Sequence, residues 1–228
     1  MSLLGAAAVT IWHNVPSEVR ADYFEWHNRE HMPERVGIPG FLRGRRYAAL
    51  TGDPEFCTLY ETESLAVLTG ADYMQRLNNP TPWTRRVASQ LRGNVRSLCR
   101  VALSLGPGQG GHMMSWRYDV APGQDAAHRA LIEERLRLVM ERPQIVGAHL
   151  CLGDRAASAV QSEEKKSRPV VALTPAWVVM VEGGGERDAL EEACAELLSD
   201  QALRDAGALD LASGLYRLQY QRVKSGSE

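Results

Sequence analysis

The chain has 228 residues, a length that fits one large domain or two small ones of about 110 residues each. Hydrophobic residues make up 44% of the chain and charged residues 24%, so a folded core is expected and a disordered or fibrous protein is excluded. Lys and Arg total 26 against 28 Asp and Glu, a formal net charge of −2, without the basic excess that binds nucleic acid or anionic lipid. We therefore expect neither nucleic acid nor a membrane as a partner.

The four cysteines are too widely spaced for a CxxC metal or redox motif. Cys57, Cys99, Cys151 and Cys194 lie 42, 52 and 43 residues apart, so reduced and buried thiols are expected. The apolar stretch at residues 3–11 has no basic segment before it, and no uncharged run reaches the roughly 18 residues of a membrane span. These features predict a cytoplasmic location.

The chain reads as two successive copies of one pattern of strands and helices. The first copy has a strand at 8–16, a helix at 17–35, strands at 41–50 and 56–63, a helix at 65–78 that extends or is interrupted before residue 90, and a strand at 97–101. The second copy repeats these elements at 113–122, 124–141, 145–153, 176–182, 186–198 and 214–218. The strands are rich in β-branched and aromatic residues. Each copy is therefore predicted to be a βαββαβ unit in an α+β fold.

A tryptophan and a glycine suggest the register between the copies. Gly44 lies 32 residues after Trp12, and Gly147 lies 31 residues after Trp116. We therefore predict that the two tryptophans are equivalent positions, and that the two glycines are equivalent as well.

Two segments set the boundaries of the copies. Glycine and proline predict a linker at 107–111, so that the first repeat covers 1–106 and the second covers 112–228. Residues 155–174 have no counterpart in the first copy and carry a charged run at 162–167. Low apolar content predicts an inserted, mobile surface loop there.

Three arginines, Arg43, Arg45 and Arg46, fall in one predicted strand of the first copy. Such a group can hold a carboxylate or a phosphate. Charged side chains along an exposed sheet edge are the commoner reason for this pattern, and we expect an exposed edge.

The first helix carries two histidines on the stripe that faces the sheet. At about 100° per residue from Tyr23, His27 falls near 40° and His31 near 80°. The second copy has mainly apolar residues in this stretch, so the histidine pair is needed once per chain. The predicted catalytic residues are His27 and His31, and the predicted substrate-binding residues are His13, Tyr23, Phe24 and Trp26.

Two imidazoles beside aromatic rings can move a proton near pH 7, because histidine titrates in this range. Such a site should border a cavity of roughly 300 Å³ or more, lined by aromatic and aliphatic groups. The alternative is structural, with both imidazoles hydrogen-bonded to backbone or water near a helix end.

A metal site is a further alternative for the same segment. His27, Glu30 and His31 match the H-x-x-E-H pattern, in which two imidazoles one turn apart bind zinc, and two histidines with one carboxylate also suit iron. Pro33 is expected to kink or end the helix, and no clear acidic ligand follows downstream. We therefore predict no metal and no cofactor.

The residues around the histidines resemble the motif of a known family. Residues 26–33 (WHNREHMP) and 39–41 (PGF) are similar to the W-H-x-x-x-H-x-P and P-G-F pattern of the EthD-like branch of the dimeric α/β-barrel superfamily. The resemblance covers the first copy, and covers the second only by element order. It implies two tandem ferredoxin-like repeats whose sheets pair into one pseudo-twofold barrel.

The resemblance also implies a class of function. Relatives in that superfamily include small monooxygenases, muconolactone isomerases, polyketide cyclases and haem-binding chlorite dismutases, so the fold alone does not name a reaction. We expect a small-molecule enzyme that acts on a hydrophobic compound of aromatic or polyketide-like type by histidine-assisted acid/base chemistry. The alternative is a binding or scaffold protein whose pocket holds such a ligand without turnover. A homodimer is left open.

Overall fold

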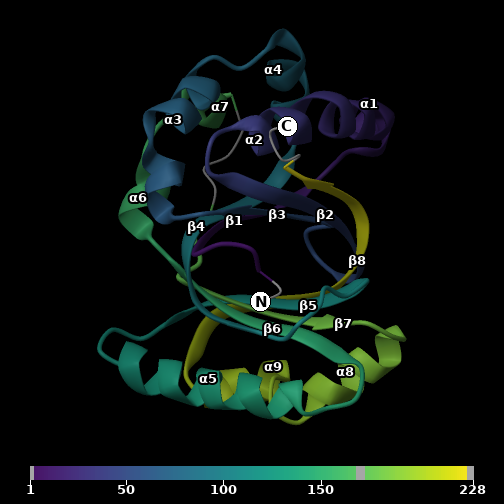
Figure 1. Cartoon of the computed structure of the whole chain (residues 1–228), viewed down its shortest axis with the longest axis vertical. Coiled ribbons are helices and arrows are strands. Elements are labelled where there is room, and N and C mark those ends of the chain that lie inside the picture. Colours follow the sequence, from purple (N-terminus) through teal and green to yellow (C-terminus); the bar gives the residue numbers. More distant parts are fainter. Residues whose placement is uncertain (1–2, 168–172, 225–228) are drawn as a thin grey trace.

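Eight strands in the described part of the chain close into one antiparallel barrel (Figure 1). The computed structural model describes residues 3–167 and 173–224. The strands are β1 (Ala7–Asn14), β2 (Phe41–Gly52), β3 (Phe56–Thr62), β4 (Arg92–Leu105), β5 (His112–Val120), β6 (Ile145–Gly153), β7 (Trp177–Gly183) and β8 (Ala208–Val223). Their order around the barrel is β1-β3-β2-β8-β5-β7-β6-β4. Each repeat gives one four-stranded sheet, and the sheets join where β2 pairs with β8 and β4 with β6.

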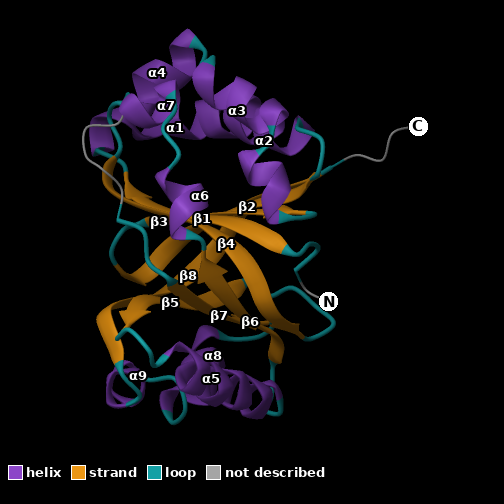
Figure 2. Cartoon of the chain, turned by 90° about the vertical axis from the view of Figure 1, so that its left-hand side faces the viewer, coloured by secondary structure: helices purple, strands orange, loops and turns teal. Residues whose placement is uncertain are grey.

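The helices cover the two outer sides of the barrel (Figure 2). One side carries α1 (Arg20–Trp26), a π turn (His27–His31), α2 (Met32–Gly37), α3 (Ala71–Asn78), α4 (Pro82–Ala88), α6 (Arg155–Ala159) and α7 (Glu163–Lys166), with single 3₁₀ turns at Ser17–Val19 and Leu65–Thr69. The other side carries α5 (Asp125–Met140), α8 (Arg187–Ala195) and α9 (Asp200–Asp205). The predicted α+β fold, with two βαββαβ repeats in one intrachain barrel, is confirmed.

The strands alternate between the barrel interior and the helices, because successive side chains of a strand point to opposite faces. In β1, Ala8 and Trp12 pack inside the barrel, whereas Val9 and Ile11 pack under the first repeat's helices. Trp116 of β5 instead belongs to the core under the second repeat's helices. The chain therefore buries three apolar layers, one inside the barrel and one beneath each group of helices.

The register between the repeats differs by one residue from the predicted one. Matching β-bulges place Arg43 opposite Glu61 in the first repeat and Gly147 opposite Glu182 in the second. Gly147 is thus equivalent to Arg43, and the predicted equivalence of Gly44 with Gly147 is wrong.

The first strands show the same shift. Cys57 lies four residues before Glu61, and Val178 lies four residues before the equivalent Glu182. Cys57 pairs with Trp12, and Val178 pairs with Arg117. Trp12 is therefore equivalent to Arg117, and the predicted equivalence of Trp12 with Trp116 is wrong. Tryptophan suits both the barrel interior and the layer under the helices, so the shared residue type did not mark a shared position.

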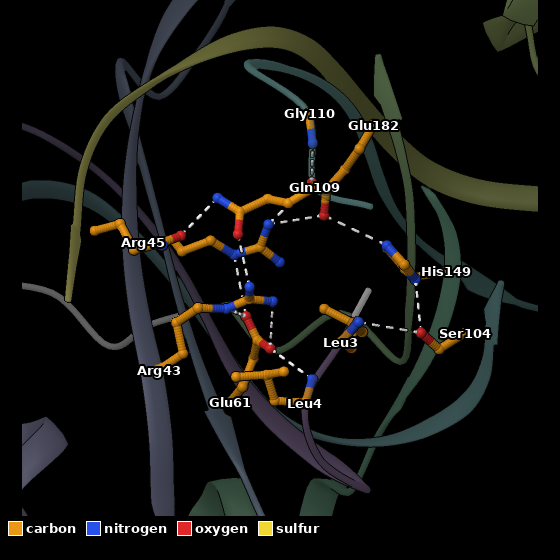
Figure 3. Close-up of polar contacts among 11 residues, drawn as sticks. Leu3, Leu4, Arg43, Arg45, Glu61, Ser104, Gln109, Gly110, His149 and Glu182 are labelled. Atoms are coloured by element: carbon orange, nitrogen blue, oxygen red, sulfur yellow. Dashed lines mark hydrogen bonds and ion pairs between the residues drawn. The ribbon is translucent and has the colours of Figure 1, made fainter. Parts of the chain in front are cut away.

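A network of buried charges joins the two sheets inside the barrel (Figure 3). Arg45 of β2 lies 2.8 Å from Glu182 of β7 and 3.0 Å from Glu61 of β3, and none of these three side chains is more than 1% exposed. Arg43 donates two hydrogen bonds of 2.8 Å to Glu61, and His149 lies 3.4 Å from Glu182. Buried charges are tolerated when they are paired and hydrogen-bonded in this way.

Backbone groups from the linker and from the beginning of the chain complete this network. Gly110 donates its N–H to Glu182 at 2.9 Å, and Leu4 donates its N–H to Glu61 at 2.8 Å. The N–H of Leu3 reaches the hydroxyl of Ser104 at 3.3 Å. The network therefore fixes the segment that connects the repeats as well as the sheets.

The exposed edge expected for the three arginines is wrong. Arg43, Arg45 and Arg46 are 6%, 0% and 3% exposed. Their strand, β2, pairs with β3 on one side and with β8 of the other repeat on the other. Closing a sheet into a barrel removes its edges.

The segment expected to be a surface loop, 155–174, contains two short helices. α7 contacts α3 and α4 of the first repeat. Its Glu164 is buried and forms an ion pair with the buried Arg35 of α2. Residues 168–172 of the predicted loop lie outside the described residues. The described part of this insertion thus covers the helices of the opposite repeat.

Candidate functional site

The two candidate histidines lie on a π turn that interrupts the first helix. The N–H of Met32 donates to the carbonyl of His27, five residues earlier rather than four. The stretch of chain from Trp12 to Arg43 is one residue longer than the equivalent stretch from Arg117 to Gly147 in the second repeat. A π turn accommodates one extra residue. Such turns are rare and are frequently found at functional sites.

The helix continues as α2 beyond Pro33, where the sequence predicted a kink or an end. In the π pattern, residue 33 would donate its N–H to the carbonyl of Asn28, and proline has no N–H. The hydroxyl of Tyr220 in β8 donates to that carbonyl instead, at 3.3 Å. A side chain from the far end of the sequence thus replaces the missing backbone donor.

The histidines border a small cavity between the first helix and the outer face of β1 and β3. The cavity has a volume of about 10 Å³ and is lined by Ile11, His13, Trp26, His27, His31, Thr58, Tyr60 and Leu91. A volume of this order holds one water-sized molecule. The cavity of roughly 300 Å³ that the sequence suggested is absent here, because aromatic rings pack closely around the imidazoles.

Four of the six predicted site residues line this cavity: His13, Trp26, His27 and His31. Tyr23 lies behind them, with its hydroxyl 3.1 Å from Nε2 of His13. Phe24 is half-buried, and its ring packs on the guanidinium of Arg46 with the Cζ atom 4.8 Å from the ring centre. The structure therefore brings three imidazoles together and leaves Phe24 outside the cavity wall.

Arg46 fixes the protonation state of His27. Its Nη1 lies 3.1 Å from Nδ1 of His27, and a guanidinium only donates, so Nδ1 accepts and the ring proton sits on Nε2. Burial lowers the pKa of His27 well below its usual value, and the neighbouring charges of His31, Arg46 and His13 act in the same direction. His27 is thus a neutral imidazole with an N–H donor at Nε2.

Other polar groups hold Arg46 in this orientation. It donates to Oδ1 of Asn28 at 2.8 Å and to Oε1 of Gln219 at 3.3 Å. Sequence reasoning placed Arg46 on an exposed edge and missed this role. The sequence feature that could have revealed this role is the group of arginines in the strand that follows the helix with the histidines, because that strand packs against the helix.

His13 and Tyr23 form a contact that the second repeat also has, with the residue types exchanged. Tyr118 and His128 occupy the positions equivalent to His13 and Tyr23, and the hydroxyl of Tyr118 lies 3.0 Å from Nε2 of His128. Nδ1 of His128 donates to the carbonyl of Ala206 at 2.9 Å. A histidine–tyrosine contact between strand and helix is therefore common to both repeats.

The His27 and His31 positions differ between the repeats. Ile132 and Leu136, four and eight residues after His128, are fully buried apolar residues. His27 and His31 have the same spacing from Tyr23. The features specific to the first repeat are thus the two imidazoles on the π turn.

Glu30 points toward α4 rather than toward the two histidines. Its carboxylate accepts hydrogen bonds from the hydroxyls of Thr81 and Thr84. Thr84 also accepts the indole N–H of Trp26 at 3.0 Å. Among the described residues no group of three or more His, Cys, Asp or Glu side chains converges as metal ligands would. The donor geometry therefore does not fit the H-x-x-E-H or facial-triad alternatives.

Tyr60 is a candidate site residue that sequence reasoning missed. It lies in β3, is 2% exposed and lines the cavity. Its hydroxyl has no hydrogen-bond partner among the described residues. Tyr60 therefore adds an unpartnered hydroxyl to the cavity wall.

A pH dependence of stability follows from the low pKa of His27. A histidine whose pKa is lower in the folded state contributes stability that is present above the unfolded pKa, near 6.5, and lost as the pH falls below it. The slope is about 1.4 kcal/mol per pH unit for each such group. Burial also lowers the pKa of His128, so two histidines contribute to this slope.

His27→Gln keeps an acceptor for Arg46 and should remove the contribution of His27 to the slope of the free energy of unfolding against pH. Urea unfolding between about pH 5 and 6.5 measures this slope. An unchanged slope in this variant would show that His27 is charged in the folded protein.

No family model matches the sequence, and no curated protein matches it. Several solved structures resemble the whole chain. An anthrone oxidase-like protein has a TM-score of 0.64 at 15% identity, covering 100% of this chain and 97% of its own. A provisionally named monooxygenase from Fusobacterium nucleatum has a TM-score of 0.60 at 10% identity, covering 99% and 98%. Another, from Lactobacillus acidophilus, has a TM-score of 0.57 at 8% identity, covering 96% and 97%.

The fold is the ferredoxin-like dimeric α/β barrel. At these identities the likeness concerns the fold alone. In this chain, both halves of the dimeric α/β barrel come from one polypeptide. None of the helices in residues 3–167 and 173–224 has the length and apolar character needed to span a bilayer.

Proposed function

We propose that this dimeric α/β barrel is an enzyme that oxidises an anthrone-like aromatic compound with molecular oxygen. The observation that carries the proposal is the neutral His27, whose Nδ1 is occupied by Arg46 and whose Nε2–H is left for chemistry beside a second imidazole, His31. The resemblance of the fold to an anthrone oxidase-like protein supports this substrate class.

The chemistry begins with removal of a proton from a carbon acid. In an anthrone, the CH₂ group lies across the central ring from a carbonyl, so loss of one proton places negative charge on the carbonyl oxygen. We assign the base to His31 and the stabilisation of the developing oxyanion to Nε2–H of His27. A neutral donor in a water-poor site suits this task, because it does not give up its proton to solvent as the pH changes.

Molecular oxygen completes the reaction. The deprotonated carbon is electron-rich and forms a C–O bond with O₂, and loss of water from the resulting peroxide leaves a second carbonyl. The overall change is CH₂ + O₂ → C=O + H₂O, in which carbon loses four electrons and O₂ gains four. The cavity of about 10 Å³ suits a molecule the size of O₂, and the aromatic substrate enters by displacing wall side chains. We place this entry at Leu91, because it lies in the short connection between α4 and β4.

Oxygen consumption tests the proposed function directly. Anthrone is added to the wild-type protein in an oxygen-electrode cell, and the quinone product is followed by its absorbance. We expect oxygen uptake and product formation in a 1:1 ratio, at a rate well above that without protein. His112→Asn should behave like the wild type, because His112 lies at the start of β5, outside the cavity. A rate equal to the uncatalysed rate would overturn the proposal, and anthrone binding without turnover would favour a ligand-binding protein instead.

A further inference from the structure

A larger cavity opens at the mouth of the barrel, on the other side of the sheet from the histidines. It has a volume of about 440 Å³ and is lined by Val95, Arg117, Tyr118, Asp119, Leu173, Thr174, Pro175, Asp210 and Ala212. This volume lies in the range of small-molecule sites. The cavity lies toward the end of β5 away from the charged network, since Glu182 pairs with Met113 and Arg117 lies four residues further along.

Arg117 is a buried cation at this cavity. It is 7% exposed, and no carboxylate of the described residues forms an ion pair with it. Its Nη2 donates to the carbonyl of Asp53 at 2.7 Å. Its guanidinium carbon lies 5.2 Å from the ring centre of Trp12, the equivalent position of the first repeat. Nη1 has no hydrogen-bond partner among the described residues.

An arginine buried without an anion is costly, because burial removes the water that stabilises its charge. The arginines inside the barrel show the usual solution, since Arg43 and Arg45 both pair with glutamate. The indole of Trp12, the carbonyl of Asp53 and the nearby hydroxyl of Tyr216 carry no negative charge, so they do not neutralise Arg117. The position therefore calls for a negatively charged partner from outside the described residues.

The carboxylates near Arg117 do not supply this charge. That of Asp53 is exposed and accepts a hydrogen bond from Nδ2 of Asn14 at 2.8 Å. Asp119 accepts the N–H of Ala176 at 2.8 Å and pairs with Arg155 at 3.0 Å. Asp210 is exposed and belongs to the outer rim. The buried part of the cavity thus offers one cation, and the remaining wall is largely apolar.

We propose that the barrel mouth binds an organic monocarboxylate with an apolar body. The carboxylate takes hydrogen bonds from Arg117, in the charge-assisted geometry that guanidinium groups favour. The apolar body packs against Val95, Pro175 and Ala212. A second carboxylate on the ligand would meet the acidic rim at Asp210, so the site selects monoanions.

This site is separate from the histidine cavity. Trp12, which stacks on Arg117, faces the barrel interior, whereas the next residue, His13, faces the helices. The binding proposal therefore does not depend on the proposed oxidation, and each can fail without the other.

Titration calorimetry with 1-naphthoate tests the site, with 1-naphthamide as a neutral ligand of nearly the same shape. We expect the wild-type protein to bind the acid about 10- to 100-fold more tightly than the amide, which is the usual gain from a charged hydrogen bond. Arg117→Met should weaken naphthoate binding by a similar factor and leave the amide little changed. Arg137→Met is the matched control, because it removes an exposed arginine on α5, and it should bind naphthoate like the wild type.

A dicarboxylate tests the acidic rim. Naphthalene-1,5-dicarboxylate should bind the wild type more weakly than 1-naphthoate. The proposal is overturned if naphthoate does not bind at millimolar concentration, if the acid and the amide bind equally, or if a folded Arg117→Met binds naphthoate unchanged. Thermal unfolding shows whether Arg117→Met is folded. If that variant does not fold, the comparison of the acid and the amide on the wild-type protein tests the proposal.

Discussion

Replacing His31 with asparagine is expected to lower the rate of anthrone oxidation about 100-fold, the usual loss when a general base is removed. Asparagine keeps a polar group at the cavity and cannot accept the proton. The rings of His31 and Trp26 lie 4.3 Å apart at their centres, so the substitution also loses a packing contact. Initial rates of oxygen uptake measure activity, and urea unfolding shows that the variant is folded under the assay conditions.

Variants of His27 separate its role from that of His31. His27→Phe removes the Nε2–H donor and one of the three acceptors of Arg46, so a loss of about 10²- to 10³-fold is expected, as for other oxyanion donors. His27→Gln can keep both an acceptor and a donor and should lose less. His112→Asn again serves as the control. Full activity in both His27→Phe and His31→Asn would move the chemistry away from this cavity.

The order of the elements could be predicted from the sequence, because each strand and helix carries a local signature. Strands such as β3 and β7 are rich in β-branched and aromatic residues, and proline and glycine mark the turns between elements. The register between the repeats could not be read in the same way. The first repeat has one extra residue, and this residue coincides with the π turn. No local sequence pattern predicted that turn.

The charged network shows what local patterns miss. Arg45 pairs with Glu182, 137 residues further along the chain. Arginines in one strand look like an exposed edge until the distant carboxylates are brought beside them. The sequence contained these partners, but only the closure of the barrel shows which of them meet.

The candidate site was partly predictable. The helical stripe with His27 and His31 follows from a 3.6-residue period, and both side chains are buried. Arg46, which binds Nδ1 of His27, and Tyr60, which lines the cavity, come from strands of the sheet below and have no motif of their own. The size of the cavity depends on how the rings of Tyr23 and Trp26 pack around the imidazoles, which residue spacing does not determine.

Replacing Glu182 with alanine is expected to lower the free energy of unfolding by about 3–5 kcal/mol, the usual cost of leaving a buried charge without its partner. Arg45 would keep Glu61 and lose two hydrogen bonds of 2.8 and 3.0 Å to Glu182. The N–H of Gly110 would lose its acceptor as well. Glu196→Ala is the matched control, because its carboxylate is 75% exposed and pairs with the half-exposed Arg142. It should cost less than about 1 kcal/mol.

Acid unfolding measures the contribution of the Glu182 carboxylate to stability in a second, independent way. Burial alone would raise the pKa of Glu182, but Arg45, His149 and the N–H of Gly110 outweigh it and lower the pKa to about 2. A carboxyl whose pKa is lower in the folded state stabilises the protein above its unfolded pKa, near 4.5, and this contribution is lost as the pH falls toward 2. Between those values the wild type should therefore lose stability faster than Glu182→Ala, in which this group is absent. If the two proteins lose stability in parallel, and if the alanine variant at neutral pH costs no more than Glu196→Ala, then the barrel interior does not depend on this ion pair, and strand pairing with apolar packing holds the two repeats together without it.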